Sequence, residues 1–132
     1  MERSYQYDIV IVGGGTAGVA AAVGAAKAGA KTLLVERNAY LGGEATNSGV
    51  NCFCGFYTCG SDPVRVVKGI GQLVLDEVRA LGPTIAEEIS ASGNRDIIFQ
   101  PEYLKCALDN LLEKEHVDYF LHTVLIGRDC GE

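Results

Sequence analysis

The sequence predicts an α/β fold built around a parallel β-sheet, and three consecutive segments near its start carry that prediction. Residues 7–12 form a short apolar, β-branched run that ends at glycine, which is typical of a fully buried parallel strand. The alanine-rich segment 16–28 indicates a helix, and Gly29 is placed to end it. Residues 31–36 form a second apolar run and predict a second strand. Strand, helix and strand in about 30 residues make a βαβ unit, whose crossover is almost always right-handed.

The middle of the chain has no such regularity at first. Residues 38–62 hold five glycines and three cysteines without a clear period, which indicates a long loop, and a long loop in a compact domain is usually functional. Apolar residues then recur at helical spacing over 64–81. Pro63 can begin that helix and Gly82 can end it.

The last third returns to the α/β pattern. Residues 97–99 indicate a short strand, and a helix with a leucine stripe is expected to begin at 100–102. Residues 117–121 predict a third parallel strand, which gives an expected strand order of 3-2-1. Residues 84–95 show no clear preference for helix or strand. Residues 123–127 are expected to be extended, and residues 129–132 are expected to form a turn.

Length and composition describe one globular domain over residues 1–132. Hydrophobic residues make up 48% and charged residues 21% of the chain, which is the balance of a folded protein. The formal net charge of −6 argues against a nucleic-acid partner or an anionic membrane surface. A bound phosphate would therefore have to be held by backbone amides and helix dipoles.

The chain shows no targeting or membrane-spanning pattern. The apolar run 9–12 is too short for a signal peptide, and a membrane span needs about 20 apolar residues. We therefore expect a cytoplasmic protein. Its five cysteines are expected to be free thiols: Cys52, Cys54, Cys59, Cys106 and Cys130.

A glycine-rich motif lies between the first expected strand and the first expected helix. Residues 13–18 have the pattern G-x-G-x-x-G, which is weak by itself because many glycine-rich loops match it. The setting is more specific, since Glu36 ends the second strand 18 positions after Gly18, close to the roughly 20 positions typical of dinucleotide-binding folds. The alternative is a structural βαβ turn without a ligand. The complete setting favours a Rossmann-like site for an adenine dinucleotide.

The positions of the motif have separate physical roles. Gly13 permits the tight turn, Gly15 lets a pyrophosphate approach the backbone, and Gly18 lets the helix pack closely on the strands. The amides at the helix start would point at the phosphates, and the helix dipole would favour their charge. Glu36 would accept hydrogen bonds from the adenosine ribose hydroxyls and disfavour a 2′-phosphate.

The residues that follow Glu36 bear on which dinucleotide is bound. Residues 36–43, ERNAYLGG, resemble the E-R-x-x-x-x-G-G stretch of two-dinucleotide-binding-domain flavoproteins, which simple NAD dehydrogenases seldom show. Over most of its length the chain resembles the FAD-dependent oxidoreductase family. Four segments carry this resemblance: the strand–helix–strand unit (7–36), LGGEAT (41–46), FCGFY (53–57) and a C-terminal stretch (99–125). The resemblance implies a three-layer FAD/NAD(P)-binding domain with FAD as cofactor.

The resemblance also implies further cofactor-lining residues. Residues 42–46 would lie along the cofactor, and the backbone near Val124 and Leu125 would approach the adenine. No catalytic residue is assigned, and no metal is expected. The candidate cofactor-binding residues are Gly13, Gly14, Gly15, Thr16, Ala17, Gly18, Glu36, Arg37, Gly42, Gly43, Glu44, Ala45, Thr46 and Leu125.

The function implied by the resemblance is oxidation or reduction of a small molecule through bound FAD. Members of the family continue well past this length, so we expect a truncated N-terminal portion, or one piece of an assembly completed by a second chain or a homo-oligomer. Two alternatives stay open at this point. They are an NAD-dependent oxidoreductase and a non-catalytic nucleotide-binding subunit.

Cysteine and histidine offer weaker candidates. Cys54 and Cys59 have the C-x4-C spacing of the redox-active disulfide in flavin disulfide reductases. In those enzymes the cysteines follow the glycine pair almost immediately, whereas Cys54 follows Gly43 by 11 positions. Buried or incidental thiols are the simpler interpretation. Adding Cys52 still leaves a zinc site short of a fourth ligand. His116 and His122 are interpreted as surface or packing residues.

Overall fold

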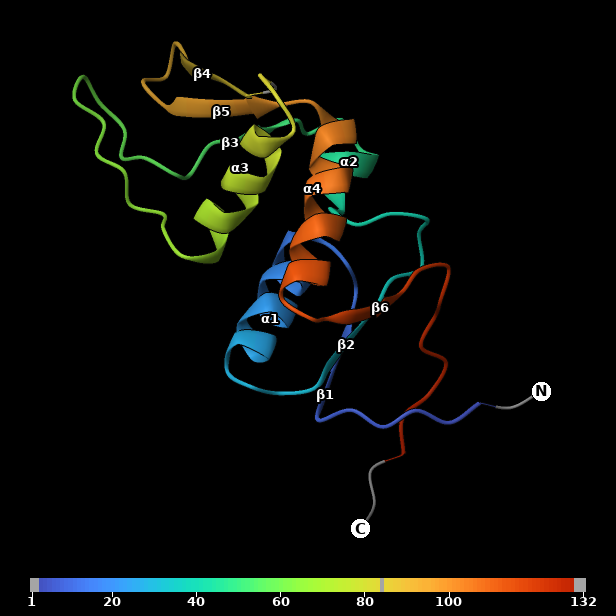
Figure 1. Ribbon diagram of the computed structural model, residues 1–132. Helices are drawn as coiled ribbons and strands as arrows, with labels where there is room; N and C mark the ends of the chain where they lie inside the picture. The colour runs from blue at the N-terminus through green and yellow to red at the C-terminus, as the bar shows by residue number, and fades with distance from the viewer. Residues whose placement is uncertain (1–2, 84, 130–132) are drawn as a thin grey trace.

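A computed structural model describes residues 3–83 and 85–129. Figure 1 shows a parallel sheet at one end of the molecule and an antiparallel sheet at the other, with the longer helices between them. In chain order the elements are β1 (Ile9–Val12), α1 (Thr16–Lys27), β2 (Thr32–Val35), α2 (Glu44–Asn47), β3 (Cys52–Phe53), α3 (Ile70–Ala80), β4 (Ile85–Ile89), β5 (Arg95–Phe99), α4 (Pro101–Lys114) and β6 (Asp118–Phe120).

The parallel sheet has the order β1-β2-β6, which confirms the strand order expected for the three apolar runs. Each strand is one or two residues shorter, at one or both ends, than the apolar run that predicted it. The register places Ile11 opposite Leu34 and Leu34 opposite Tyr119. This row faces α1 and α4, whose apolar side chains share one core cluster with it.

The opposite face of β1 differs from the expectation. The sequence predicted a fully buried strand, but the side chains of Val10 and Val12 are 52% and 54% exposed. Alternate residues of a strand point to opposite faces, so both valines lie on the face away from the row of Ile11. The described residues form the sheet and one helical layer, and they leave this face of β1 open. The prediction of complete burial is therefore wrong for β1.

The helix α1 follows the glycine motif directly. Gly15 precedes it in an extended conformation, and the helix ends at Lys27, one residue before the expected end. Gly29 then adopts a φ of 92°, and its amide donates to the carbonyl of Ala26 at 2.8 Å. Glycine is favoured at such a position because a left-handed φ strains other residues.

Two strands of the antiparallel sheet lie in segments that sequence patterns left without regular structure, whereas the third, β5, contains the expected strand 97–99. The expected loop 38–62 contains α2 and β3, and the ambiguous segment 84–95 contains β4 and the start of β5. The strand order is β3-β5-β4. The hairpin closes with the amide of Ser90 donating to the carbonyl of Asn94 at 2.8 Å. The expected extended stretch 123–127 forms no regular element, and in the expected turn 129–132 residues 130–132 lie outside the described residues.

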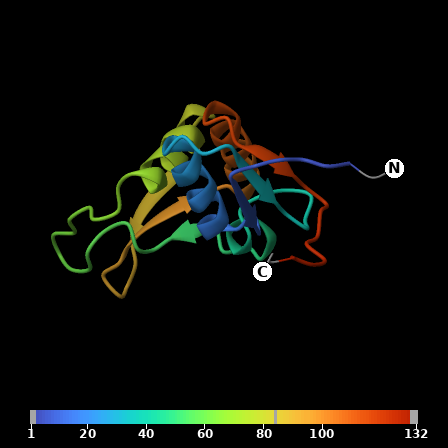
Figure 2. The same ribbon diagram turned by 90° about the horizontal axis from the view of Figure 1, so that it is seen from below.

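The helix α3 begins at Ile70, later than the expected start at Pro63. The preceding segment pairs with the loop before it, since the amide of Val66 donates to the carbonyl of Phe56 at 2.9 Å. Gly69, with a φ of 66°, is the last residue before the helix. The loop between β3 and α3 projects from the body of the molecule in both views (Figure 1, Figure 2).

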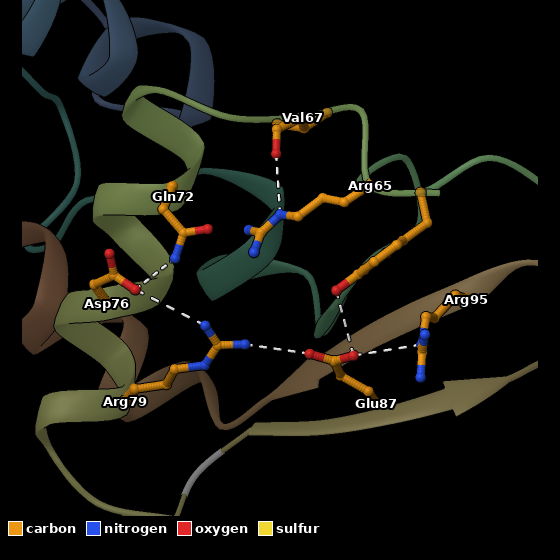
Figure 3. A network of polar contacts seen from close by, with 8 residues as sticks. Arg65, Val67, Gln72, Asp76, Arg79, Glu87 and Arg95 are labelled. Atoms are coloured by element: carbon orange, nitrogen blue, oxygen red, sulfur yellow. Dashed lines mark hydrogen bonds and ion pairs between the residues drawn. The ribbon is translucent and has the colours of Figure 1, made fainter. Parts of the chain in front are cut away.

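One ion pair joins α3 to the β4–β5 hairpin, and a second lies within the hairpin (Figure 3). The carboxylate of Glu87 on β4 lies 3.2 Å from Nη2 of Arg79 on α3 and 3.4 Å from Nε of Arg95 on β5. Exposed pairs of this kind contribute about 0–1 kcal/mol each. The stronger attachment is apolar, because Leu75 of α3 and Ile97 of β5 are fully buried in one cluster with Phe56.

Candidate dinucleotide site

Two glycine-containing loops meet at the N-terminus of α1. The amide of Gly42 donates to the carbonyl of Gly14 at 2.8 Å, and Gly15 forms a parallel bridge with Gly42. A Cβ atom on Gly43 would stand 3.0 Å from the Cα of Gly15, which is closer than most Cβ contacts in proteins. The loop after β1 and the loop before α2 are therefore in backbone contact, and a side chain at Gly43 would require one of them to shift.

The turn from β1 into α1 needs glycine at two positions. Gly13 has a φ of 104°, a conformation that other residues adopt only with strain. A Cβ atom on Gly18 would collide with the carbonyl oxygen of Gly13. The first turn of α1 thus packs directly on the end of β1.

The start of α1 offers open amide groups. Gly15 has no side chain with which to cap the helix, and the first turn contains no acidic residue. Thr16 and Ala17 are exposed, and their amides make no hydrogen bond to any described residue. The amides of Gly13 and Gly14 are already occupied, the first by the carbonyl of Val35 at 2.7 Å. The amides at Thr16 and Ala17, together with the helix dipole, can hold an anion.

Glu36 holds this loop in place from the end of β2. Its Oε2 accepts the amide of Gly14 at 2.5 Å, and its Oε1 accepts the amide of Asn38 at 2.8 Å. The side chain is only 6% exposed. Burial alone would raise the pKa of this carboxyl, but the amides of Asn38 and Gly14 and the charge of Arg37 outweigh burial and hold the pKa below its ordinary value. Glu36 is therefore ionised at neutral pH.

A cleft of about 310 Å³ lies beside Glu36 at the carboxyl ends of β1 and β2. Its far wall is the chain after β6, which the amide of Thr123 fixes by donating to the carbonyl of Glu36 at 2.9 Å. The cleft therefore brings together residues that are far apart in the sequence, and five of them were expected from the sequence to lie at one cofactor. The residues that line it are Val12, Gly13, Val35, Glu36, Arg37, Thr123, Val124 and Leu125.

The short helix α2 supports the second glycine loop. The hydroxyl of Thr46 donates to the carbonyl of Leu41 at 2.6 Å, and its methyl fills the space that a side chain on Gly42 would need. Ala45 and Thr46 are buried, whereas Glu44 is exposed beside the start of α1. Two of the three expected cofactor residues on α2 thus direct their side chains into the protein.

A second cleft, of about 230 Å³, opens between α1, α3 and α4. Its lining residues are apolar apart from Thr16, which also begins α1. The sequence did not predict this cleft, because the apolar residues of α3 have the same spacing whether they line a cleft or fill a core. The available sign of a cleft was the presence of small residues in segments that pack against aromatic ones. The lining residues are Thr16, Val19, Ala20, Phe53, Phe56, Val67, Ile70, Gly71, Val74, Leu104 and Leu108.

The cysteine and histidine candidates lie elsewhere. Cys52, Cys54, Cys59 and Cys106 are free thiols, as expected, and Cys130 lies outside the described residues. The thiol of Cys59 donates to Oδ1 of Asn94 at 2.8 Å. Within 3–83 and 85–129, no three side chains of the metal-binding types come together as ligands.

Both histidines are exposed residues with left-handed backbones. His116 has a φ of 56° and His122 a φ of 51°. His116 follows the end of α4, and its amide donates to the carbonyl of Glu113 at 3.1 Å.

In the part of the chain that the structure describes, no helix is long and apolar enough to cross a bilayer.

Curated relatives cover most of this chain and a minor part of their own length. A digeranylgeranylglycerophospholipid reductase of Thermoplasma acidophilum is 31% identical over 123 residues, which cover 87% of this chain and 26% of that protein. A thiamine thiazole synthase of Aeropyrum pernix is 32% identical over 103 residues, with 69% and 34% covered. The chain thus spans about a quarter to a third of the length of these relatives.

Solved structures share the fold. The 3-ketosteroid-Δ4-(5α)-dehydrogenase of Rhodococcus jostii matches 92% of this chain and 38% of its own with a TM-score of 0.55 and 21% identity. The THI4 protein of Thermovibrio ammonificans matches 87% and 38% with a TM-score of 0.52 and 20% identity.

The residues present fit an adenine dinucleotide: Gly13 and the ionised Glu36 line one cleft, the loop of Gly13–Gly15 touches the second glycine loop, and it leads into the open start of α1. The family model described as FAD dependent oxidoreductase matches residues 8–131. This chain belongs to the FAD-dependent oxidoreductase family.

Proposed function

We propose that this chain holds FAD by its ADP half and forms the cofactor-binding part of an oxidoreductase that acts on a small molecule. The observation that carries the proposal is the cleft shared by Gly13, Glu36, Arg37 and Leu125. These residues are far apart in the sequence, and the fold gathers them beside the open start of α1.

Each part of the site has a role in binding. The amides of Thr16 and Ala17 bind the pyrophosphate, assisted by the dipole of α1. The carboxylate of Glu36 keeps lone pairs free for the ribose hydroxyls, because each of its oxygens accepts only one amide. The side chains of Val124 and Leu125 form the apolar wall for the adenine.

FAD, when bound, supplies the two-electron or hydride transfer. The residues of this chain bind and orient it, and Glu36 contributes negative charge that disfavours a 2′-phosphate. The glycine pair at 42–43 and the family match favour FAD over NAD. We also propose a cytoplasmic location, supported by the four free thiols.

The proposal is tested with the 132-residue chain and two adjacent variants. Leu125 is half exposed in the cleft and Ile126, fully exposed, lies outside it. Leu125→Glu places a charge against the adenine wall, so we expect weaker binding of FAD and of ADP in calorimetric titration. Ile126→Glu is the matched control and should bind as the parent does, with both variants equally stable to urea.

A second measurement identifies the nucleotide. The purified chain is denatured, and any released nucleotide is identified by mass and by its visible flavin absorbance. Release of FAD, or tighter binding of FAD than of NAD, supports the proposal. Protection of the chain against thermal unfolding by NAD but not by FAD would overturn it, as would equal binding by the two variants.

A further inference from the structure

Two cysteines flank one aromatic residue on the short strand β3. Phe53 points inward, where its ring packs on Phe99 with centroids 4.5 Å apart. Cys52 and Cys54 therefore project together on the other side of the strand, since residues two apart share a face. Their sulfur atoms are 3.5 Å apart, and both residues are free thiols.

The backbone allows these sulfurs to bond at the limit of ordinary geometry. Two residues of a strand span about 6.6 Å between Cα atoms, and disulfides occur with Cα separations up to about 6.8 Å. β3 ends at Phe53, so Cys54 lies just past the strand and can adjust. Cys54 is exposed, and exposed disulfides are among those that are reduced easily.

Two other cysteines, Cys59 and Cys106, belong to the part of the chain that the structure describes. Cys59, which shares the C-x4-C spacing with Cys54, donates its thiol to Asn94 in the β4–β5 turn. Cys106 lies on α4. Cys52 is the thiol that the fold holds against Cys54.

We propose that Cys52 and Cys54 form a reversible disulfide, and that a low-molecular-weight disulfide oxidises them. One cysteine, as thiolate, attacks the small disulfide, so that a mixed disulfide forms and one small thiol leaves. The second cysteine then attacks the protein sulfur of that mixed disulfide and releases the second small thiol. Two electrons pass from the cysteine pair to the small disulfide, and the two cysteine protons end on the two released thiols.

Asp96 of β5 faces this pair and contributes to its reactivity. It is the residue of β5 opposite Cys54 when the register of β3 and β5 is extended by one position. The hydrogen bond with Cys52, burial, and the hydrogen bond and charge of Asp96 raise the pKa of Cys54 to about 11. Cys52 and Asp96 are the titratable groups that face Cys54. The thiolate is the attacking species, so removing the charge of Asp96 should accelerate oxidation.

The test uses the intact chain, reduced and then freed of reductant. It is exposed to oxidised glutathione, quenched with an alkylating agent and weighed by mass spectrometry. We expect the wild type to lose two hydrogens and two alkylation sites, with recovery after dithiothreitol. Cys59→Ser and Cys106→Ser should do the same, whereas Cys52→Ser and Cys54→Ser should stop at the glutathione adduct.

A rate measurement separates this chemistry from a structural role. Asp96→Asn should oxidise faster than the wild type by up to about tenfold, since one pKa unit changes the thiolate fraction tenfold. Asp76→Asn, on α3, is the control and should oxidise at the parent rate. Loss of two hydrogens by Cys52→Ser or Cys54→Ser, a Cys54–Cys59 bond in the wild type, or an adduct that never resolves would each overturn the proposal.

Discussion

The amide nitrogen of Gly14 lies 2.5 Å from Oε2 of Glu36, and this hydrogen bond joins the loop after β1 to the end of β2. The other carboxylate oxygen accepts the amide of Asn38. The same side chain borders the cleft in which Leu125 lies. One buried acid therefore fixes the shape of the glycine loop and also faces the proposed cofactor.

Glu36→Gln should destabilise the fold as well as weaken binding. A glutamine can accept only one of the two amides, and its own NH2 group would face the other. We expect a loss of about 1–3 kcal/mol in the free energy of unfolding, measured by urea denaturation. Glu88→Gln on the exposed face of β4 is the control and should change stability by less than about 0.5 kcal/mol.

The loss in Glu36→Gln should depend on pH. The folded-state pKa of Glu36 lies below its ordinary value, so its contribution is complete above the unfolded pKa of about 4.3. It disappears as pH falls through the lower, folded pKa. A difference between variant and wild type that stays constant into strong acid would contradict this account.

The charge of Asp109 should lower the stability of the fold at neutral pH, whereas the charge of Glu36 raises it. It is half-buried on α4, and its Oδ1 finds no hydrogen-bond partner among the described residues. Burial, followed by the charge of Glu113, raises its pKa. Asp109→Asn should therefore stabilise the protein at neutral pH, as measured by urea denaturation. The advantage should shrink as pH falls through the raised pKa, because the wild-type carboxyl then becomes neutral.

Two glycines of α1 should respond in opposite directions to alanine. Gly18→Ala forces a methyl against the carbonyl of Gly13, and we expect a loss of about 1–3 kcal/mol or failure to fold. A methyl on Gly24 would lie 3.5 Å from Ile70, an ordinary contact. Gly24→Ala should therefore gain about 0.5–1 kcal/mol from helix propensity. Thermal unfolding of both variants compares them, and equal effects would count against the tight approach at Gly18.

The two faces of the parallel sheet should differ in how much stability a substitution costs. Val12 is half exposed, so Val12→Thr should change the unfolding free energy by about 0.5 kcal/mol or less. Leu34 is fully buried in the core cluster, and Leu34→Ala should lose about 2–5 kcal/mol. A loss at Val12 comparable to that at Leu34 would mean that the face of Val12 is covered in solution.

The βαβ unit could be predicted because its signals are local. Apolar runs, the spacing of Gly18 to Glu36 and the stop at Gly29 each depend on neighbouring residues. The burial of β1 could not be predicted in this way. Residues 9–12 are equally apolar whether or not another layer covers Val10 and Val12.

Two strands of the antiparallel sheet, β3 and β4, were missed for a different reason. β3 has two residues and exists through its pairing with β5, so Cys52 and Phe53 carry no pattern of their own. The start of α3 was wrong because the valines before Gly69 fit helical spacing, whereas Val66 pairs with Phe56. The candidate residues of the site were named from the motif and from the family resemblance. That Glu36 binds the amide of Gly14 depends on side-chain geometry that no spacing reveals.

The contact between Gly15 and the loop at 42–43 has a further consequence. Both loops that would touch the pyrophosphate are already fixed to each other and to Glu36 by hydrogen bonds that need no ligand. The entropy of ordering them is lost during folding, not during association. The proposed site is therefore preorganised: a nucleotide that bound there would meet two loops that folding has already ordered.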